Sequence, residues 1–331
     1  MKKLKTIFKI LTAAMALAGA VSFTSCSQTQ KDENGCFIDI DEAAKFAEKK
    51  NQDIMVIVTM DGDDSASSDF LDKVVRDSQF KNDIATKFAV VCMDFSQKTY
   101  QTTIADENAS KKEKKSAEAK SNLVQKNMLY AGKLNATQTP VVYILSKEQY
   151  IITGLFYDDE NRSYDGFKTL ISEKNELIEE MHKMILQTKL GTAEEKIAAI
   201  DALYEKTSPD YRFLLLDLLD SVKKLDPTNK TGLLGKFIYN AGLARADTAI
   251  VAGDAKAAIQ AYLDVTNEEF VSGEMKQQAM YTVAYMTSMT GFEDVSAVIS
   301  YLEKAIEFAP ESDDVPAIKR VIAAISQQQA Q

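Results

Sequence analysis

The sequence predicts an α/β domain with a mixed sheet, followed by an all-helical domain. Three observations favour this fold class. A chain of 331 residues is too long for a single domain with one ordinary hydrophobic core, and it suits two domains of about 100–200 residues each. Strand-like and helix-like segments alternate from Phe37 to about residue 180. Beyond about Leu190 the strand signals stop, and only helix-sized segments follow.

The start of the chain has the layout of a secretory signal. Four lysines come first, namely Lys2, Lys3, Lys5 and Lys9. An apolar stretch then runs from Ile10 to about Ala20, too short for a mature membrane span. It ends in "FTSC", which resembles a lipobox with an atypical first residue and implies that Cys26 becomes the acylated N-terminus. The alternative is a plain secreted protein in which Cys26 has no such role.

Charge limits the classes of partner. Cleavage after residue 25 removes four lysines and no acids, which changes the formal net charge from −10 to −14. Such a negative net charge disfavours binding to nucleic acid and to anionic membrane surfaces. Residues 26–36 are largely polar and suit a lipidated tether. We therefore expect a membrane-anchored lipoprotein of the cell envelope that faces the periplasm or the exterior, in either membrane.

The cysteines do not form a redox motif. Besides Cys26 there are only Cys36 and Cys92, and no C-x-x-C occurs in the chain. Cys92 lies in the apolar run "FAVVCMDF", where a free cysteine is most often a small buried hydrophobe. A disulfide between Cys36 and Cys92 stays an alternative in an exported protein.

The first half of the α/β domain contains two predicted strands. A short strand or turn at residue 37 leads into a helix with small and apolar residues at helical spacing up to residue 50. The run "DIMVIVTM" predicts a buried strand by its β-branched content. Phe70, Leu71, Val74 and Val75 recur at helical spacing and predict an amphipathic helix. "KFAVVCMDF" is the next strand.

The second half begins with a charged segment. Residues 104–122 mix lysine and glutamate, which predicts a solvated loop running into a charged helix face. "LVQKNMLYAGKL" then predicts a helix, and "TPVVYIL" and "YIITGLFY" predict two strands. One long helix follows over residues 165–187, so the predicted order is βαβαββα.

With these elements in place, residues 37–182 resemble the thioredoxin-like superfamily. Laid on its "D-W-C-x-x-C" pattern, "DDSASS" from Asp63 puts Ser65 and Ser68 at the positions of the two cysteines. Thr139-Pro140 matches the family's cis-proline position beside the redox site. The resemblance implies the fold, but the sulfur atoms that carry the chemistry are missing, so the activity is in doubt.

Serine cannot replace cysteine in this chemistry. Thiol–disulfide exchange needs a thiolate, which a helix N-terminus stabilises. We expect Ser65 and Ser68 to bond the free amides of a helix start instead, with Asp63 and Asp64 near the positive end of its dipole. A serine nucleophile would need a base, and the only histidine, His182, lies far along the chain.

A calcium loop is a further interpretation of the acidic turn. Oxygen ligands stand at the EF-hand positions, namely Asp61, Asp63, Ser65, Ser67, Asp69 and Asp72. However, Ala66 occupies the glycine position and Asp72 the position of the bidentate glutamate. A strand also precedes the loop where a helix is required. We therefore predict no metal and no cofactor.

The segments of residues 183–331 resemble degenerate tetratricopeptide repeats. "GDAKAAIQAYLDV" at Gly253 and "FEDVSAVISYLEKAIEFAPES" at Phe292 are alike, and "LLDSVKKLDPTN" shares the closing helix. Equivalent points recur at about 34–38 residues, as in stacked helix pairs. The positions that fit are Gly253, Asp254, Ala258, Ile259, Tyr262, Tyr301, Ala305 and Pro310. A generic helical bundle is the alternative.

Together these features predict a protein-binding or assembly module. We expect the helical half to bind a neutral or basic protein partner, because stacked helix pairs form extended surfaces. Acidic residues of this half are Asp217, Asp220, Glu268, Glu269 and Glu274. The alternative function is a thiol–disulfide oxidoreductase-related enzyme that uses Cys36 or Cys92 with an external partner.

Overall fold

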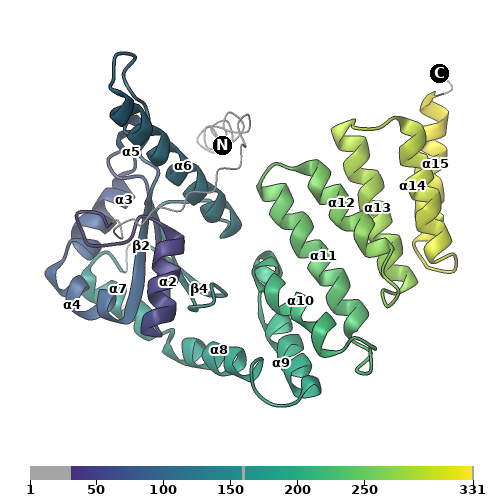
Figure 1. The fold of residues 1–331 in the computed structure, drawn as a ribbon, viewed down its shortest axis with the longest axis horizontal. Helices are drawn as coiled ribbons and strands as arrows, with labels where there is room; N and C mark the ends of the chain where they lie inside the picture. Colours follow the sequence, from purple (N-terminus) through teal and green to yellow (C-terminus); the bar gives the residue numbers. More distant parts are fainter. Residues whose placement is uncertain (1–30, 159–160, 330–331) are drawn as a thin grey trace. The chain divides into compact units, whose positions relative to one another are not determined.

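The computed structural model describes residues 31–158 and 161–329, which form two compact units divided between His182 and Lys183 (Figure 1). The first unit contains a small mixed α/β sheet and the second contains helices only, as the sequence predicts. Within the described ranges, no helix combines the length and the apolar character that a membrane crossing requires.

A four-stranded mixed sheet forms the centre of the first unit. Strand β1 (Asp53–Thr59) pairs in parallel with β2 (Phe88–Asp94) and antiparallel with β3 (Val141–Leu145). Strand β4 (Ile151–Phe156) pairs antiparallel with β3, which gives the order β2-β1-β3-β4. Every residue of β1 after Asp53 is buried, which explains its continuous apolar sequence.

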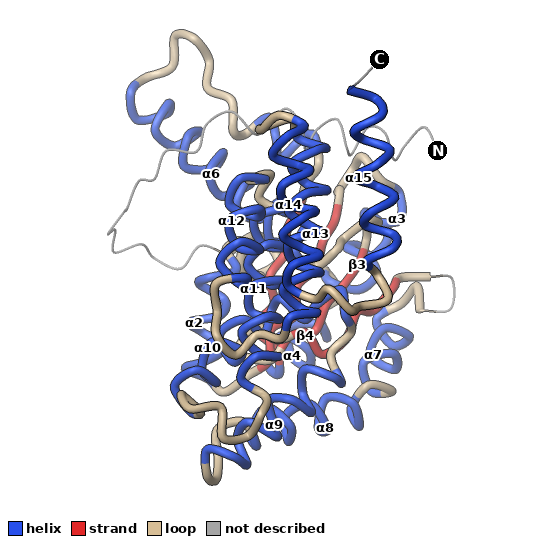
Figure 2. The backbone as a smooth tube through the Cα atoms, turned by 90° about the vertical axis from the view of Figure 1, so that its right-hand side faces the viewer, coloured by secondary structure: helices blue, strands red, loops and turns tan. Residues whose placement is uncertain are grey.

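Helices cover both faces of this sheet. The helical segments of this part of the chain are α2 (Ile40–Lys50), α3 (Ser65–Phe70), the π-helical turn η1 (Leu71–Val75), α4 (Ser78–Lys87), α5 (Gln97–Gln101), α6 (Lys111–Lys133), α7 (Tyr164–Ser172) and α8 (Asn175–Gln187), which crosses the boundary between the units. In Figure 2 the strands lie between α2 on one side and α7 on the other. Phe70 and Phe167 meet edge to face with their ring centroids 5.2 Å apart, so α3 and α7 share one core.

Three element boundaries differ from the sequence-based expectation. The segment at Phe37 forms only isolated bridges, to Lys31 and to Val91. The helix predicted from Phe70 begins earlier, at Ser65, because Asp64 caps it. The predicted long helix is interrupted between α7 and α8, where the Lys174 amide donates to the Ile171 carbonyl and tightens the turn.

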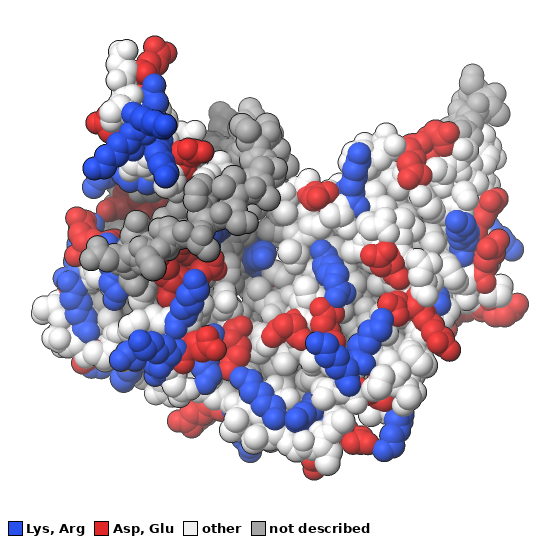
Figure 3. Space-filling model, in the orientation of Figure 1, with Lys and Arg blue, Asp and Glu red and all other residues white. Residues whose placement is uncertain are grey.

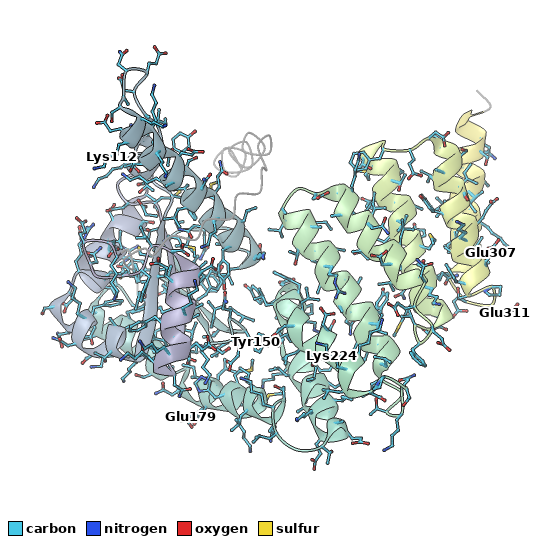
Figure 4. The ribbon with its side chains drawn as sticks, in the orientation of Figure 1. Lys112, Tyr150, Glu179, Lys224, Glu307 and Glu311 are labelled. Atoms are coloured by element: carbon cyan, nitrogen blue, oxygen red, sulfur yellow. The ribbon has the colours of Figure 1, made fainter. Side chains whose placement is uncertain are left out.

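Helix α6 begins in the charged segment. Ser110 and Glu113 form a capping box at its first turn, with the Ser110 amide donating to Glu113 Oε2 at 2.8 Å. Figure 3 shows positive side chains gathered over this end of the helix. They include the exposed Lys111, Lys112, Lys114 and Lys115, and Lys112 projects outward in Figure 4. The charged face is solvated, as predicted.

The second unit is a series of antiparallel helices in which each packs on the next (Figure 1). They are α9 (Ala193–Lys206), the 3₁₀ turn η2 (Pro209–Leu215), α10 (Leu216–Leu225), α11 (Leu234–Val251), α12 (Ala255–Thr266), α13 (Gly273–Thr290), α14 (Val295–Phe308) and α15 (Val315–Gln329). Side chains of Asp254, Ser272 and Asp294 cap α12, α13 and α14.

Small residues let these helices approach closely. Ala258 and Ala305 are fully buried in the helical core. A Cβ at Gly235 would lie 1.9 Å from the Phe270 carbonyl oxygen, and a Cβ at Gly273 would lie 2.3 Å from that of Phe308. Both contacts involve backbone atoms, so only glycine fits at these two helix starts.

Candidate functional site

The acidic turn after β1 is organised around Asp64, the N-cap residue of α3. Its carboxylate accepts hydrogen bonds from the Ala66 amide at 3.2 Å and the Ser67 amide at 3.3 Å. It also accepts from Ser67 Oγ at 2.9 Å and from Thr139 Oγ1 at 3.0 Å. One carboxylate therefore neutralises the helix start and holds the loop before β3 against it.

The hydroxyls of Ser67 and Ser68 are fully engaged. Ser67 is completely buried, and its Oγ accepts from the Met60 amide at 3.0 Å while donating to Asp64. Ser68 Oγ accepts a hydrogen bond from the Gly62 amide at 2.9 Å and donates one to Asp61 Oδ1 at 3.1 Å. Each hydroxyl thus closes the turn by acting as donor and acceptor.

The residues predicted for the emptied redox site are only partly brought together. Thr139 and the buried Pro140 lie beside the start of α3, and the peptide bond between them is cis. Ser65 is exposed and its hydroxyl makes no hydrogen bond to the described residues. Thr139 donates instead to Asp64, which the sequence analysis placed near the helix start but not at a cysteine position. The preference for aspartate at N-caps is the signal that identifies this residue.

Asp94 at the end of β2 ties the neighbouring strand into the same network. Its Oδ1 accepts from the Asp61 amide at 2.9 Å, and its Oδ2 accepts from Ser96 Oγ at 2.6 Å and from Thr99 Oγ1. Because β1 and β2 are parallel, their carboxyl ends meet at one edge of the sheet. The network therefore joins the segments that follow β1 and β2.

The acidic residues of the turn are paired with cations and donors. Arg76 binds Asp61 at 2.9 Å and also binds Asp72. Asp69 binds Lys73 at 2.6 Å and accepts from the Tyr157 hydroxyl at 2.7 Å, bonds that lower the pKa of Asp69. Across residues 31–158 and 161–329, no group of three or more histidine, cysteine or acidic side chains could hold a metal ion.

A cavity of about 350 Å³ lies next to this network. Its walls include Asp61 and Arg76 from the site, Cys92 from β2, and Leu123 and Asn127 from α6. Asn127 donates from Nδ2 to the Ile38 carbonyl at 2.9 Å, while its buried Oδ1 has no hydrogen-bond partner in the described part of the chain. The cavity thus combines apolar walls with charged groups at the edge of the sheet.

Cys36 and Cys92 are buried, and both are free. Burial raises the pKa of Cys36 to about 12 and raises that of Cys92 well above its ordinary value. At neutral pH both groups are therefore thiols, which are poor nucleophiles. Cys26, the predicted lipidation site, lies outside the described residues, as do the signal and most of the tether.

His182 has a structural contact. Its Nε2 lies 2.8 Å from Asp53 Oδ1 at the start of β1, and this hydrogen bond raises the pKa of the imidazole. The side chain is 48% exposed and far in sequence from every serine of the turn. The contact fastens α8 to the sheet.

Two of the acidic residues predicted to face a partner are paired within the helical unit. Asp220 pairs with Arg245, and Glu268 pairs with Lys223 at 3.0 Å. Other charged side chains of this unit are exposed, among them Lys224 of α10, Glu307 of α14 and Glu311 of the turn after α14, which are labelled in Figure 4. Most of this charge is a solvated surface.

Comparison with known proteins gives one partial sequence relative and one partial family match. A family described as "Uncharacterised protein C-terminal domain" matches residues 233–331. A protein of Treponema pallidum (strain Nichols), named "Uncharacterized protein", is 32% identical over 131 residues. That alignment covers 39% of this chain, and this chain spans only 43% of the length of the relative.

The structural comparison gives a distant neighbour. The solved structure named "DsbH Oxidoreductase" is similar with a TM-score of 0.30 and 15% sequence identity. The match covers 47% of this chain and 94% of that chain. The likeness concerns about half of the chain.

Proposed function

We propose that this chain is a membrane-anchored envelope lipoprotein that acts as a protein-binding or assembly module. Its first unit is a thioredoxin-like domain that has lost its redox chemistry, and its second unit is a helical-repeat domain that carries the partner. The observation that carries the proposal is the hydrogen-bond network around Asp64. In this network carboxylate and hydroxyl groups surround the start of α3, where a redox-active thioredoxin-like domain would have its dithiol.

The sheet order and the loop before β3 support the thioredoxin-like assignment. Parallel β1 and β2, antiparallel β3 and β4, and the Thr139-Pro140 loop beside the α3 start are the frame of that fold. Within this frame Asp64 and Ser67 stand three positions apart at the helix start, with Asp64 against Thr139 and Ser67 buried. We infer that these two residues, in place of Ser65 and Ser68, occupy the positions of the lost cysteines.

The alternative, an oxidoreductase that uses Cys36 or Cys92, receives little support. Exchange requires a thiolate that a partner disulfide can reach. Both sulfur atoms are buried and both thiols have a raised pKa. A disulfide reductase assay with an external dithiol should show no rate above background, and the rate should be the same when Cys36→Ser and Cys92→Ser are introduced.

A recurring contact supports the repeat assignment. Gly235 opens α11 beside the Phe270 carbonyl, and Gly273 opens α13 beside that of Phe308. Each phenylalanine follows its glycine by the same number of positions, and the two glycines are 38 residues apart. This spacing falls in the range expected of stacked helix pairs.

The anchor is tested by metabolic labelling with a fatty-acid analogue. The wild-type protein should carry the label and partition with membranes. Cys26→Ala should carry none and should be released in soluble form. Equal labelling of both proteins would contradict the lipid anchor and would favour a plain secreted protein.

The binding role is tested by photo-crosslinking in intact cells. A photoreactive phenylalanine is placed at Tyr285 of the helical unit or at Tyr100 of the first unit, which are both 59% exposed. Cross-linked adducts of the full-length lipoprotein are then identified by mass spectrometry. We expect one reproducible adduct from Tyr285 and none from Tyr100. The reverse pattern would assign the partner to the first unit.

A further inference from the structure

A band of exposed aromatic and aliphatic side chains follows helix α13. Tyr281, Tyr285 and Met289 are 40%, 59% and 70% exposed, and their four-residue spacing puts them on one face. Residues 277–292 contain no charged residue, although 27% of the chain is charged. Large apolar side chains concentrated on an uncharged surface are typical of interaction sites.

The adjoining face of α11 extends this band. The Tyr239 hydroxyl donates to Gln278 Oε1 at 3.1 Å, which joins α11 to α13. Helix α12 packs on both helices and runs antiparallel to each, so α11 and α13 run in the same direction. Ile250, which is 50% exposed, and Met289 each lie three helical turns beyond this hydrogen-bonded pair, so they stand at the same level.

Asp247 is the only charged residue of α11 without an ion pair among the described residues. Lys236 binds Asp201 at 2.6 Å and Glu205 at 2.8 Å, and Arg245 binds Asp220. Asp247 lies eight positions beyond Tyr239 and three before Ile250, so it borders the side of α11 that carries these two residues and stands level with the segment around Tyr285.

The surroundings of Asp247 are partly desolvated. Its residue surface stays exposed, but neighbouring protein atoms displace part of its water and raise its pKa. Burial raises the pKa of Tyr262 of α12 to about 12, and the nearby Asp247 and Tyr239 act in the same direction. A carboxylate among tyrosines and without a counter-ion is complementary to a cation.

We propose that this α11–α13 face binds an apolar segment of a partner protein that places a lysine or arginine side chain opposite Asp247. The face consists of Tyr239, Asp247, Ile250, Gln278, Tyr281, Tyr285 and Met289. Tyrosine and methionine side chains supply adaptable apolar contacts, and the tyrosine rings can also form cation–π contacts with the lysine or arginine of the partner. This assignment rests on the proposed binding function and specifies the surface and the chemistry of the partner.

The test begins with random dodecapeptides displayed on phage and selected on the mature full-length protein. We expect the selected peptides to be enriched in apolar residues flanking one lysine or arginine. A selected pool without basic residues, a pool of acidic peptides, or the absence of any selected binder would overturn the proposal.

Variants then locate the site with one synthetic selected peptide, using fluorescence anisotropy. Asp247→Asn and Tyr285→Ala should each weaken binding by about tenfold or more, as for central contacts of an interface. Glu303→Gln, which removes an exposed carboxylate from α14, and Tyr100→Ala should leave binding unchanged. Circular dichroism of each variant checks the fold. Unchanged binding by a folded Asp247→Asn protein would overturn the assignment.

Two further measurements separate this proposal from other occupants and from the proposed function. Sedimentation that shows a dimer of the wild type and a monomer of Tyr285→Ala would assign the face to a second copy of this chain and overturn the proposal. The second measurement repeats the photo-crosslinking in cells with Asp247→Asn and the photoreactive residue at another exposed position of the helical unit. If the partner is still cross-linked, the surface assignment fails while the binding function stands. Loss of the adduct supports both.

Discussion

Thr139 donates a 3.0 Å hydrogen bond from Oγ1 to Asp64 Oδ2 and so joins two segments that are 75 positions apart in the chain. The same carboxylate accepts three hydrogen bonds from the first turn of α3. The capping of a helix and the position of the loop before β3 therefore depend on one side chain. In this arrangement Asp64 is a structural group whose carboxylate accepts four hydrogen bonds.

Asp64→Ala is expected to destabilise the first unit by about 2 kcal/mol, the upper range for loss of an N-cap. The expectation follows because the buried Ser67 hydroxyl and Thr139 also lose their acceptor. Urea unfolding followed by hydrogen-exchange mass spectrometry reports the first unit separately. Asp294→Ala, which removes the cap of α14, is the control that should affect only the helical unit. A change below about 0.5 kcal/mol in the first unit would contradict the central role of Asp64.

Introduced cysteines can distinguish the two placements of the lost dithiol. The double change Asp64→Cys and Ser67→Cys should give a pair that closes into a disulfide in a glutathione buffer, because one site is the N-cap of α3 and the other is the buried third residue of the same first turn. Ser65→Cys with Ser68→Cys is the matched pair, which should oxidise to a smaller extent. Thiol titration with mass spectrometry measures both. More complete oxidation of the second pair would restore the original placement on Ser65 and Ser68.

The contact between His182 and Asp53 predicts a small pH dependence of stability. The hydrogen bond to Asp53 raises the pKa of the imidazole, with Glu148 acting in the same direction and Lys147 against it. A raised folded-state pKa means that the contribution is complete below the unfolded pKa of about 6.5 and is lost as pH rises through the folded value. We expect at most about 0.5 kcal/mol, because the histidine is half exposed. Hydrogen exchange of α8 at acidic and alkaline pH measures it, and His182→Gln should remove the difference.

The two glycines of α11 should respond differently to alanine. A Cβ at Gly235 meets the Phe270 carbonyl oxygen at 1.9 Å, whereas a Cβ at Gly242 meets Val265 Cγ2 at 2.1 Å. Backbone cannot move aside as a side chain can, so Gly235→Ala should cost about 3 kcal/mol. Gly242→Ala should cost less, because the Val265 side chain can shift and because the helical preference of alanine, about 1 kcal/mol, applies fully at this interior position of the helix. Thermal unfolding of the two variants compares them. Equal losses would show that the Phe270 backbone moves as readily as the Val265 side chain.

The mixed sheet and the helices after it could be predicted because their signals are local. The runs "DIMVIVT" and "VVYIL" are continuous and apolar, and they become β1 and β3. The start of α3 was less accessible to prediction. Its apolar spacing begins only at Phe70, while the helix begins where Asp64 caps it. Apolar periodicity identifies the buried face of a helix but gives its ends less reliably.

The site depended on contacts between distant segments. The pattern of six residues from Asp63 allowed either Ser65 with Ser68 or Asp64 with Ser67, since both pairs are three apart. Our inferred pair is favoured by the burial of Ser67, whose Oγ accepts from the Met60 amide, and by the hydrogen bond from Thr139 to Asp64. Likewise, the pairing of Asp220 with Arg245 depends on the packing of α10 on α11 and has no local signal.

Cys36 and Cys92 lie shielded in the first unit without bonding to another sulfur atom. Among the described residues, the native fold therefore contains no covalent link whose survival depends on the surrounding redox potential. The same folded state should be equally stable in an oxidising and in a reducing compartment. Maturation of this part of the chain then requires neither a thiol oxidase nor a disulfide isomerase, and its described residues can keep one conformation in either redox environment.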